Sequence, residues 1–141
     1  MSERRWDWIP GTGVGPCRFG TPVVEYEAYL DLKLVRPEGA SVTGWGMYEV
    51  GGPEKTVWTE NGKIEAVQCE DFFIFTNKNL IGMSERELIA HLEKKPDEVG
   101  DSVEYENGSI QTPYEFEDLA LEVWFENGIL VSASAGEIVD D

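Results

Sequence analysis

Few side chains in this sequence are of the types that carry out catalysis, and their spacing matches no known catalytic motif. The single histidine, His91, lies beside the apolar positions of a predicted helix and has no serine or cysteine nucleophile motif around it. A His–Cys pair would require Cys17 or Cys69 to reach His91 in the folded chain, and the sequence leaves this alternative open. Because the two cysteines stand in no CxxC or Cys/His cluster, we interpret them as reduced structural thiols.

Binding sites for metals and nucleotides are not supported either. The acids Asp97, Glu98 and Asp101 do not have the spacing of an EF-hand loop. The run Gly11-Thr-Gly13-Val-Gly15 lacks the third spaced glycine of a dinucleotide-binding fingerprint and is followed by Pro16. Paired carboxylates for glycoside hydrolysis carry no information in a chain with 28 acids. We therefore expect no enzyme activity, no metal and no cofactor.

The charge of the chain points to a different kind of chemistry, namely electrostatic recognition. Its 28 acidic and 11 basic residues give a net charge of −17. The charge is uneven, because 13 acids and no lysine or arginine follow Lys95. Such a field repels nucleic acid and anionic membranes and accelerates encounter with a basic protein. We expect a basic protein partner, no nucleic acid and no membrane; an acidic coat that only confers solubility is the alternative.

A repeated pattern organises the elements that would carry such an interaction. Val57–Ile64 and Val123–Leu130, 66 residues apart, each contain an apolar run, a Glu-Asn-Gly turn and a second apolar run. Asn-Gly between such runs predicts a hairpin, because a type I′ turn needs positive φ at both central residues. A second match, at an offset of 62, relates Phe19-Gly20-Thr21 and Glu25-x-x-Ala28-x-Leu30 to Ile81-Gly82-Met83 and Glu87-x-x-Ala90-x-Leu92. The pattern predicts one domain, 1–141, with internal repeat units of about 9–70 and 71–135.

Each unit is predicted to begin with a helix and to continue as antiparallel strands. In the first unit, Thr21-Pro22 starts a helix that ends near Leu32. In the second, Ser84-Glu-Arg-Glu87 forms a capping box for a helix that runs to about Lys95. Strands are expected at 44–50, 55–60, 63–69, 72–75 (a strand or an extended link), 102–106, 109–112, 119–126 and 129–135. This order predicts an α+β fold made of two tandem helix-then-antiparallel-sheet units.

Alternation along the strand at 119–126 separates a core face from a face that carries aromatic and acidic side chains. Val123 and Phe125 share the core face, whereas Trp124 and its equivalent in the first unit, Trp58, lie on the other. Aromatic side chains on an open sheet face are interface anchors, unless a segment such as Trp6–Trp8 covers them. We therefore predict a partner-binding surface that consists of Trp58, Tyr114, Glu117, Asp118, Glu122, Trp124 and Glu126.

Two short motifs carry a resemblance to a known family. They are Val14-Gly15-Pro16-x-x-Phe19-Gly20 and Leu80-x-Gly82-Met83-Ser84. The chain resembles, over most of residues 9–131, a family of small acidic bacterial proteins described as immunity proteins for secreted or contact-delivered toxins. It departs from that pattern at Thr21, where methionine is usual, and in the Gly-rich segment 36–54. The two-unit plan is also similar to the β-lactamase inhibitor protein, which binds its enzyme with a concave sheet face. Neither resemblance implies catalytic residues.

These observations together predict a function in binding rather than in catalysis. The beginning of the chain has no apolar segment of a signal peptide, and no run is long enough to span a membrane, so we expect a cytoplasmic protein. We expect it to neutralise a basic partner protein, as an immunity protein for a bacterial toxin. The alternative is a structural or regulatory protein-interaction module without a toxin partner.

Overall fold

The computed structural model describes residues 6–28, 30–39 and 44–138. It is mostly antiparallel β-sheet, with one α-helix among the described residues. The helix α1 spans Glu85–Leu92, and two 3₁₀ turns, η1 and η2, span Val23–Tyr26 and Glu117–Leu119. The strands are β1 (Trp8–Ile9), β2 (Gly13–Val14), β3 (Cys17–Arg18), β4 (Leu32–Arg36), β5 (Gly46–Val50), β6 (Lys55–Glu60), β7 (Lys63–Cys69), β8 (Ile74–Phe75), β9 (Lys78–Asn79), β10 (Glu98–Val99), β11 (Val103–Glu104), β12 (Ile110–Phe116), β13 (Leu121–Glu126) and β14 (Ile129–Gly136).

The predicted α+β fold of two helix-then-sheet units is therefore wrong. In place of the helix predicted from Thr21 to near Leu32, the chain forms only the short turn η1 and then enters β4. Pro22 occupies the N-cap of η1 and offers no side-chain hydrogen bond to the first turn. The next two residues, Val23 and Val24, are β-branched and lose side-chain freedom in a helix. Without a side-chain cap and with poor helix formers behind it, the described residues of the first unit form no α-helix.

The helix of the second unit forms because its cap is complete. The Ser84 hydroxyl accepts a hydrogen bond from the Glu87 N–H at 3.2 Å, and the Glu87 carboxylate accepts one from the Ser84 N–H at 3.1 Å. This confirms the predicted capping box. The helix ends at Leu92 rather than near Lys95, because Glu93 adopts a left-handed conformation with φ 57°.

The two predicted Asn-Gly hairpins are present, as β6–β7 and β13–β14. Asn61 and Asn127 begin their turns with φ of 54° and 53°, and both glycines that follow also have positive φ. The register of both hairpins shifts at the same place, directly after Trp58 and directly after Trp124. The hairpins are therefore equivalent down to their β-bulges.

The two hairpins join through their last strands in one nine-stranded sheet, ordered β10-β12-β13-β14-β7-β6-β5-β4, with β11 also paired to β12. At this junction Gln68 lies opposite Ser134. These two residues are equivalent in the hairpin repeat, so the junction relates the hairpins by a local two-fold axis. Such a matched register is what the predicted duplication implies, whereas the unit boundaries 9–70 and 71–135 stay a prediction.

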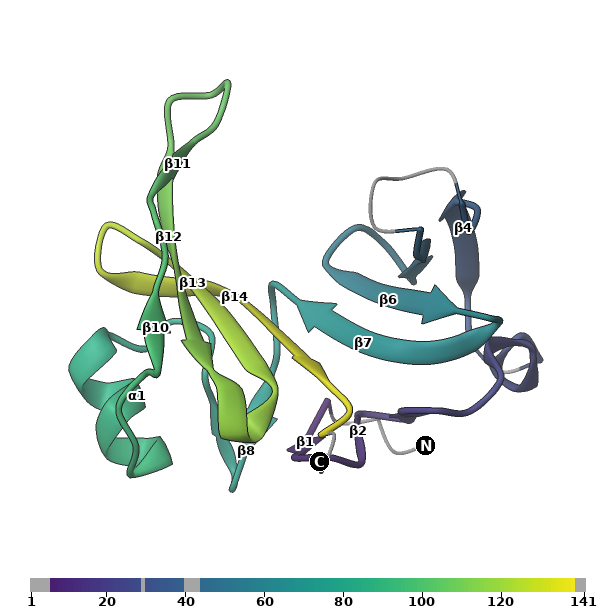
Figure 1. Ribbon diagram of the computed structural model, residues 1–141, viewed down its shortest axis with the longest axis horizontal. Coiled ribbons are helices and arrows are strands. Elements are labelled where there is room, and N and C mark those ends of the chain that lie inside the picture. Colours follow the sequence, from purple (N-terminus) through teal and green to yellow (C-terminus); the bar gives the residue numbers. More distant parts are fainter. Residues whose placement is uncertain (1–5, 29, 40–43, 139–141) are drawn as a thin grey trace.

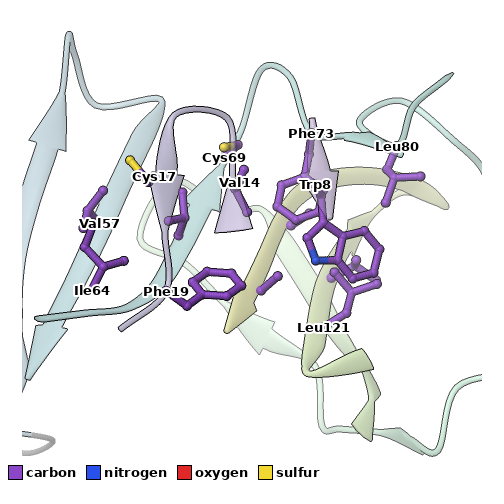
Figure 2. Close-up of a cluster of buried hydrophobic side chains, with 14 of the residues drawn as sticks. Trp8, Val14, Cys17, Phe19, Val57, Ile64, Cys69, Phe73, Leu80 and Leu121 are labelled. Carbon is purple, nitrogen blue, oxygen red and sulfur yellow. The ribbon is translucent and has the colours of Figure 1, made fainter. Parts of the chain in front are cut away.

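One face of the sheet is covered by the hydrophobic core. The N-terminal strands β1–β3, the hairpin β8–β9 and helix α1 lie on this side (Figure 1). Trp8 is 2% exposed and its ring lies 5.5 Å from that of Phe73 in the core cluster (Figure 2). Gly13 lies so close to the chain that an added Cβ would sit 2.2 Å from the Cys17 carbonyl oxygen. Glycine at position 13 thus allows β2 and β3 to approach each other closely within the small N-terminal sheet.

The other face of the sheet is concave. Figure 1 shows β11 and β12 rising on one side of the β7–β14 pair, and β4 rising on the other. Strands bend at the two bulges after Trp58 and Trp124, and bulges increase local twist. The alternative in which Trp6–Trp8 covers these tryptophans is not observed, because Trp6 and Trp8 pack against the core.

Candidate functional site

A row of polar side chains crosses the sheet on the face opposite the core. Glu115 lies opposite both Glu98 and Glu122, and Glu122 lies opposite Ser134. From Ser134 the row continues to Gln68 across the junction. Because side chains alternate along a strand, this row lies on the face away from the buried residues on either side of it. We call the surface around the row the concave face, defined by Trp45, Trp58, Glu65, Ala66, Gln68, Glu70, Glu115, Glu122, Trp124, Ser132 and Ser134.

Two half-buried tryptophans occupy equivalent places on the concave face. Trp58 lies opposite Ala66, and Trp124 lies opposite Ser132. The indole Nε1 of Trp124 donates a hydrogen bond to Glu122 at 3.1 Å. Each ring therefore lies beside a small side chain of the neighbouring strand and keeps a part of its surface exposed on this face.

Three adjoining hollows lie along the concave face. The central hollow, of 240 Å³, is lined by Trp45, Trp58, Ala66, Gln68, Glu122 and Ser134. A hollow of 460 Å³ extends from it past Trp124 toward Tyr105, and one of 370 Å³ extends in the other direction toward Glu65 and Glu137. The described residues that line the three hollows include neither lysine nor arginine. The concave face is thus aromatic and acidic.

The carboxylates of this face are crowded and only partly solvated. Burial raises the pKa of Glu115, and the hydrogen bond and charge of Glu122, followed by those of Glu98, raise it further. Burial is also the main cause of the raised pKa of Glu65 and of Glu70, with nearby carboxylates adding to it in both cases. All three groups would be stabilised in their charged form by a cation placed on the face.

Four of the predicted binding residues line these hollows. They are Trp58, Glu117, Glu122 and Trp124. Glu126 lies at the end of the same strand as Trp124 and accepts a hydrogen bond from the Gln111 amide at 3.2 Å.

The other two predicted residues lie elsewhere. Tyr114 is on the core side of the sheet, because its ring packs 4.7 Å from Phe125 and its hydroxyl donates to Glu85 on α1 at 2.9 Å. Asp118 is exposed in η2 and forms an ion pair with Lys94 at 3.2 Å. Tyr114 and Asp118 are therefore separate from the surface that contains the two tryptophans.

Several residues of the concave face were not found by sequence reasoning. Trp45 directly precedes β5, and its indole Nε1 donates to Glu60 at 3.1 Å. Gln68 sits at the junction and donates to the Ser132 hydroxyl at 2.9 Å. Glu115 is placed beside Glu122 only by the pairing of β12 with β13. Alternation within β7 and β12 could have assigned the face of Gln68 and Glu115, but the pattern gives no strand order.

His91 and Cys69, two side chains with catalytic potential, are engaged in structural roles. His91 Nε2 lies 2.6 Å from the Phe75 carbonyl oxygen, to which it donates, and 3.0 Å from the Thr76 hydroxyl. Cys69 is fully buried, and this burial raises the pKa of its thiol to about 12. A protonated thiol is a poor nucleophile, so Cys69 is not activated for a His–Cys mechanism. The absence of enzyme activity stays a prediction.

One acidic group among the described residues has a spacing that could hold a metal ion. Carboxylate oxygens of Glu98, Glu115 and Glu117 lie within 4.8 Å of one another. Two of the three residues are exposed, and exposed acidic groups are common without an ion. Their closeness adds to the negative potential at the edge of the concave face.

No family model, no curated protein and no solved structure matches this chain. The resemblance of the two short motifs to immunity proteins therefore stays a prediction. In the part of the chain that the structure describes, no helix is long and apolar enough to cross a membrane.

Proposed function

We propose that this chain is a cytoplasmic acidic binding protein that neutralises a basic partner protein through its concave face. We further propose that the partner is a bacterial toxin, to which the chain confers immunity. One observation carries the proposal: the concave face combines half-buried tryptophans with crowded carboxylates, and among the residues that the structure describes no basic side chain lines its hollows.

The carboxylates would act first on the rate of association. A chain with net charge −17 attracts a basic partner over distances comparable to the Debye length, about 8–10 Å in physiological salt. Such steering raises association rates by about 10-fold or more at low salt. Glu115 and Glu122 would then meet lysine or arginine side chains of the partner. If the partner is a nuclease, these carboxylates would occupy the place of substrate phosphates.

The tryptophans would supply the affinity that remains after desolvation. Partly buried aromatic side chains in a concave surface are frequent hot spots, each contributing about 2 kcal/mol or more when truncated. Trp58 and Trp124 are the candidates, because both line hollows on the concave face. Tyr114 is not part of this proposal, since it lies on the core side.

The second candidate function is a structural or regulatory interaction module without a toxin partner. It uses the same surface and the same basic partner, so geometry alone does not separate the two. What separates them is whether binding abolishes a harmful activity of the partner.

The test begins with capture of partners from the native host, using the chain and a Glu115→Gln, Glu122→Gln variant as paired baits. A partner held by the chain but not by the variant is purified and expressed in a sensitive host with and without the chain. We expect growth to stop with the partner alone and to resume when the chain is present. If the captured partner is harmless, the interaction module is the better description.

Kinetics with the purified partner then test the mechanism of binding. Association measured at about 50 and 500 mM salt should slow markedly as screening increases. Trp124→Ala should leave the association rate unchanged and speed dissociation, with a loss of about 2 kcal/mol or more. Glu25→Gln, which removes an exposed acid from η1, is the matched control and should change neither rate. Equal association rates at both salt concentrations would refute electrostatic steering.

A further inference from the structure

The central hollow has the size of a pocket for a single side chain. Its volume is 240 Å³, whereas sites for drug-sized molecules span about 300–1,000 Å³. It opens onto the concave face between residues of the first hairpin and residues of the second, close to the local two-fold axis at Gln68 and Ser134. Building on the proposed function, we propose that this hollow binds one arginine side chain of the basic partner, with the guanidinium group against Trp45 and Trp58 and its N–H groups directed at Glu122.

Two indole rings form the apolar part of the hollow. Trp58 is half-buried on β6 and lies opposite the small side chain of Ala66. Trp45 is oriented by the hydrogen bond that its Nε1 donates to Glu60. A planar guanidinium packs against aromatic faces through cation–π attraction and stacking. The orientation of Trp45 is therefore set before a ligand arrives, which lowers the entropic cost of binding.

Oxygen atoms form the polar part of the hollow. The Glu122 carboxylate is held in place by the Trp124 indole, at 3.1 Å. Gln68 uses its amide nitrogen to donate to Ser132, so its carbonyl oxygen remains as an acceptor. The hydroxyl of Ser134 adds a further acceptor. Among the polar groups that line the hollow, hydrogen-bond acceptors thus outnumber donors, which suits a cation with several N–H groups.

Arginine fits this arrangement better than the other cations a protein can offer. Its guanidinium presents five N–H donors in a planar fork, can stack on indole, and is more weakly hydrated than an ammonium group. Lysine offers a compact and strongly hydrated charge that cannot stack in this way. A neutral side chain would leave Glu122, which lies opposite Glu115, without a counter-charge.

The test uses three small probes and the intact chain. Nα-acetyl-arginine amide is titrated at constant ionic strength while the indole N–H signals of the five tryptophans are followed by NMR. The corresponding lysine and citrulline amides are titrated in the same way; citrulline keeps the shape of arginine and lacks its charge. We expect saturable shifts of the Trp45 and Trp58 signals with arginine, at least about threefold weaker binding of lysine, and no binding of citrulline.

Matched variants locate the binding site of the probe. Glu122→Gln should weaken arginine binding by about 10-fold, because a hydrogen bond to a charged group is lost. Glu126→Gln, on the same strand but outside the hollow, should leave it unchanged. Trp58→Leu should weaken binding by about threefold, because the cation–π contact is lost.

The outcomes separate this inference from the function on which it rests. Equal binding of arginine and lysine, binding of citrulline, or full binding by the Glu122→Gln variant would each overturn the arginine pocket. The proposed function would survive such a result if the captured partner still lost affinity for the Glu115→Gln, Glu122→Gln variant. Conversely, a partner indifferent to that variant would overturn the proposed function, whatever the arginine titration shows.

Discussion

Replacing Glu115 by glutamine should stabilise the folded chain at neutral pH. Glu115 lies directly opposite Glu98 on β10 and Glu122 on β13. Like charges that face each other on neighbouring strands destabilise a sheet, and we take the size of each effect as that of a favourable cross-strand pair, roughly 0.2–1 kcal/mol. The substitution removes two such pairs and keeps the size of the side chain. The expected gain in the free energy of unfolding is therefore about 0.4–2 kcal/mol.

The pH dependence of this gain follows from the direction of the pKa shift. Burial, followed by the neighbouring carboxylates, raises the pKa of Glu115 above its ordinary value of 4.5. The folded chain then binds more protons than the unfolded chain, so the free energy of unfolding falls as pH rises from 4.5 through the raised pKa. The stabilisation by Glu115→Gln should accordingly be near zero at about pH 4 and complete near pH 7.

Urea unfolding followed by tryptophan fluorescence measures the gain at both pH values, in low salt so that screening does not hide it. A gain of 1 kcal/mol corresponds to a rise of roughly 3–5 °C in the melting temperature of a chain this long. Glu126→Gln is the control, because its cross-strand neighbours, Gln111 and Ile129, carry no charge. The reasoning fails if Glu115→Gln is no more stable than the original chain at pH 7, or if its gain is the same at pH 4.

Three further predictions concern the frame around the concave face. Gly62→Ala and Gly128→Ala should each lower the free energy of unfolding in urea by about 1–2 kcal/mol, because both residues have positive φ. The two losses should be similar, because both positions have open space around them and only the backbone strain differs from glycine; clearly unequal losses would argue against equivalent turns. Ser84→Ala should cost about 1 kcal/mol by loss of the helix cap, with a matching loss of helical circular dichroism; an unchanged stability would contradict the role of the cap. Cys69, with a pKa of about 12, should resist thiol reagents at pH 8 until the chain unfolds, and the free energy of unfolding should fall as pH rises from 9 toward 12; rapid labelling of the native chain at Cys69 would refute this.

The sequence predicted local elements well where a few adjacent residues determine them. Asn61 and Asn127, each followed by glycine, specify their turns through positive φ. Both hairpins form: the strands at 55–60 and 63–69 have the predicted bounds, and the ends of the strands predicted at 119–126 and 129–135 lie within two residues of the observed ends. Ser84 specifies a helix start through its capping box. The prediction for the first unit was wrong at Thr21, the expected N-cap: its hydroxyl donates to the Arg18 carbonyl oxygen at 2.6 Å, and Pro22, which has no hydroxyl, occupies the N-cap of η1. The Thr-Pro start signal and the apolar spacing therefore predicted a helix that the β-branched residues Val23 and Val24 do not support.

For the candidate site, the sequence predicted only which side chains of a single strand share a face. Alternation along β13 placed Glu122 and Trp124 on the face away from the core, where they lie. Tyr114 was not assigned a face, because β12 extends to Phe116, beyond the predicted strand at 109–112. Gln68 joins the site through pairing with a strand 66 residues away, for which no local pattern exists. Strand order, rather than strand identity, was the missing information.

The junction of β7 and β14 has a consequence for what each half of the chain would do alone. Val67 and Cys69 meet Ala135 and Ala133 in an arrangement that is unchanged when the two strands exchange places. This is the isologous contact by which identical subunits form two-fold dimers. A fragment that ended after β7 would present its last strand as an unpaired edge already complementary to another copy of itself. In the intact chain, the covalent link between the halves lets β7 pair with β14 of the same molecule rather than with β7 of another copy. We therefore expect intermolecular strand pairing in truncated or partly synthesised chains.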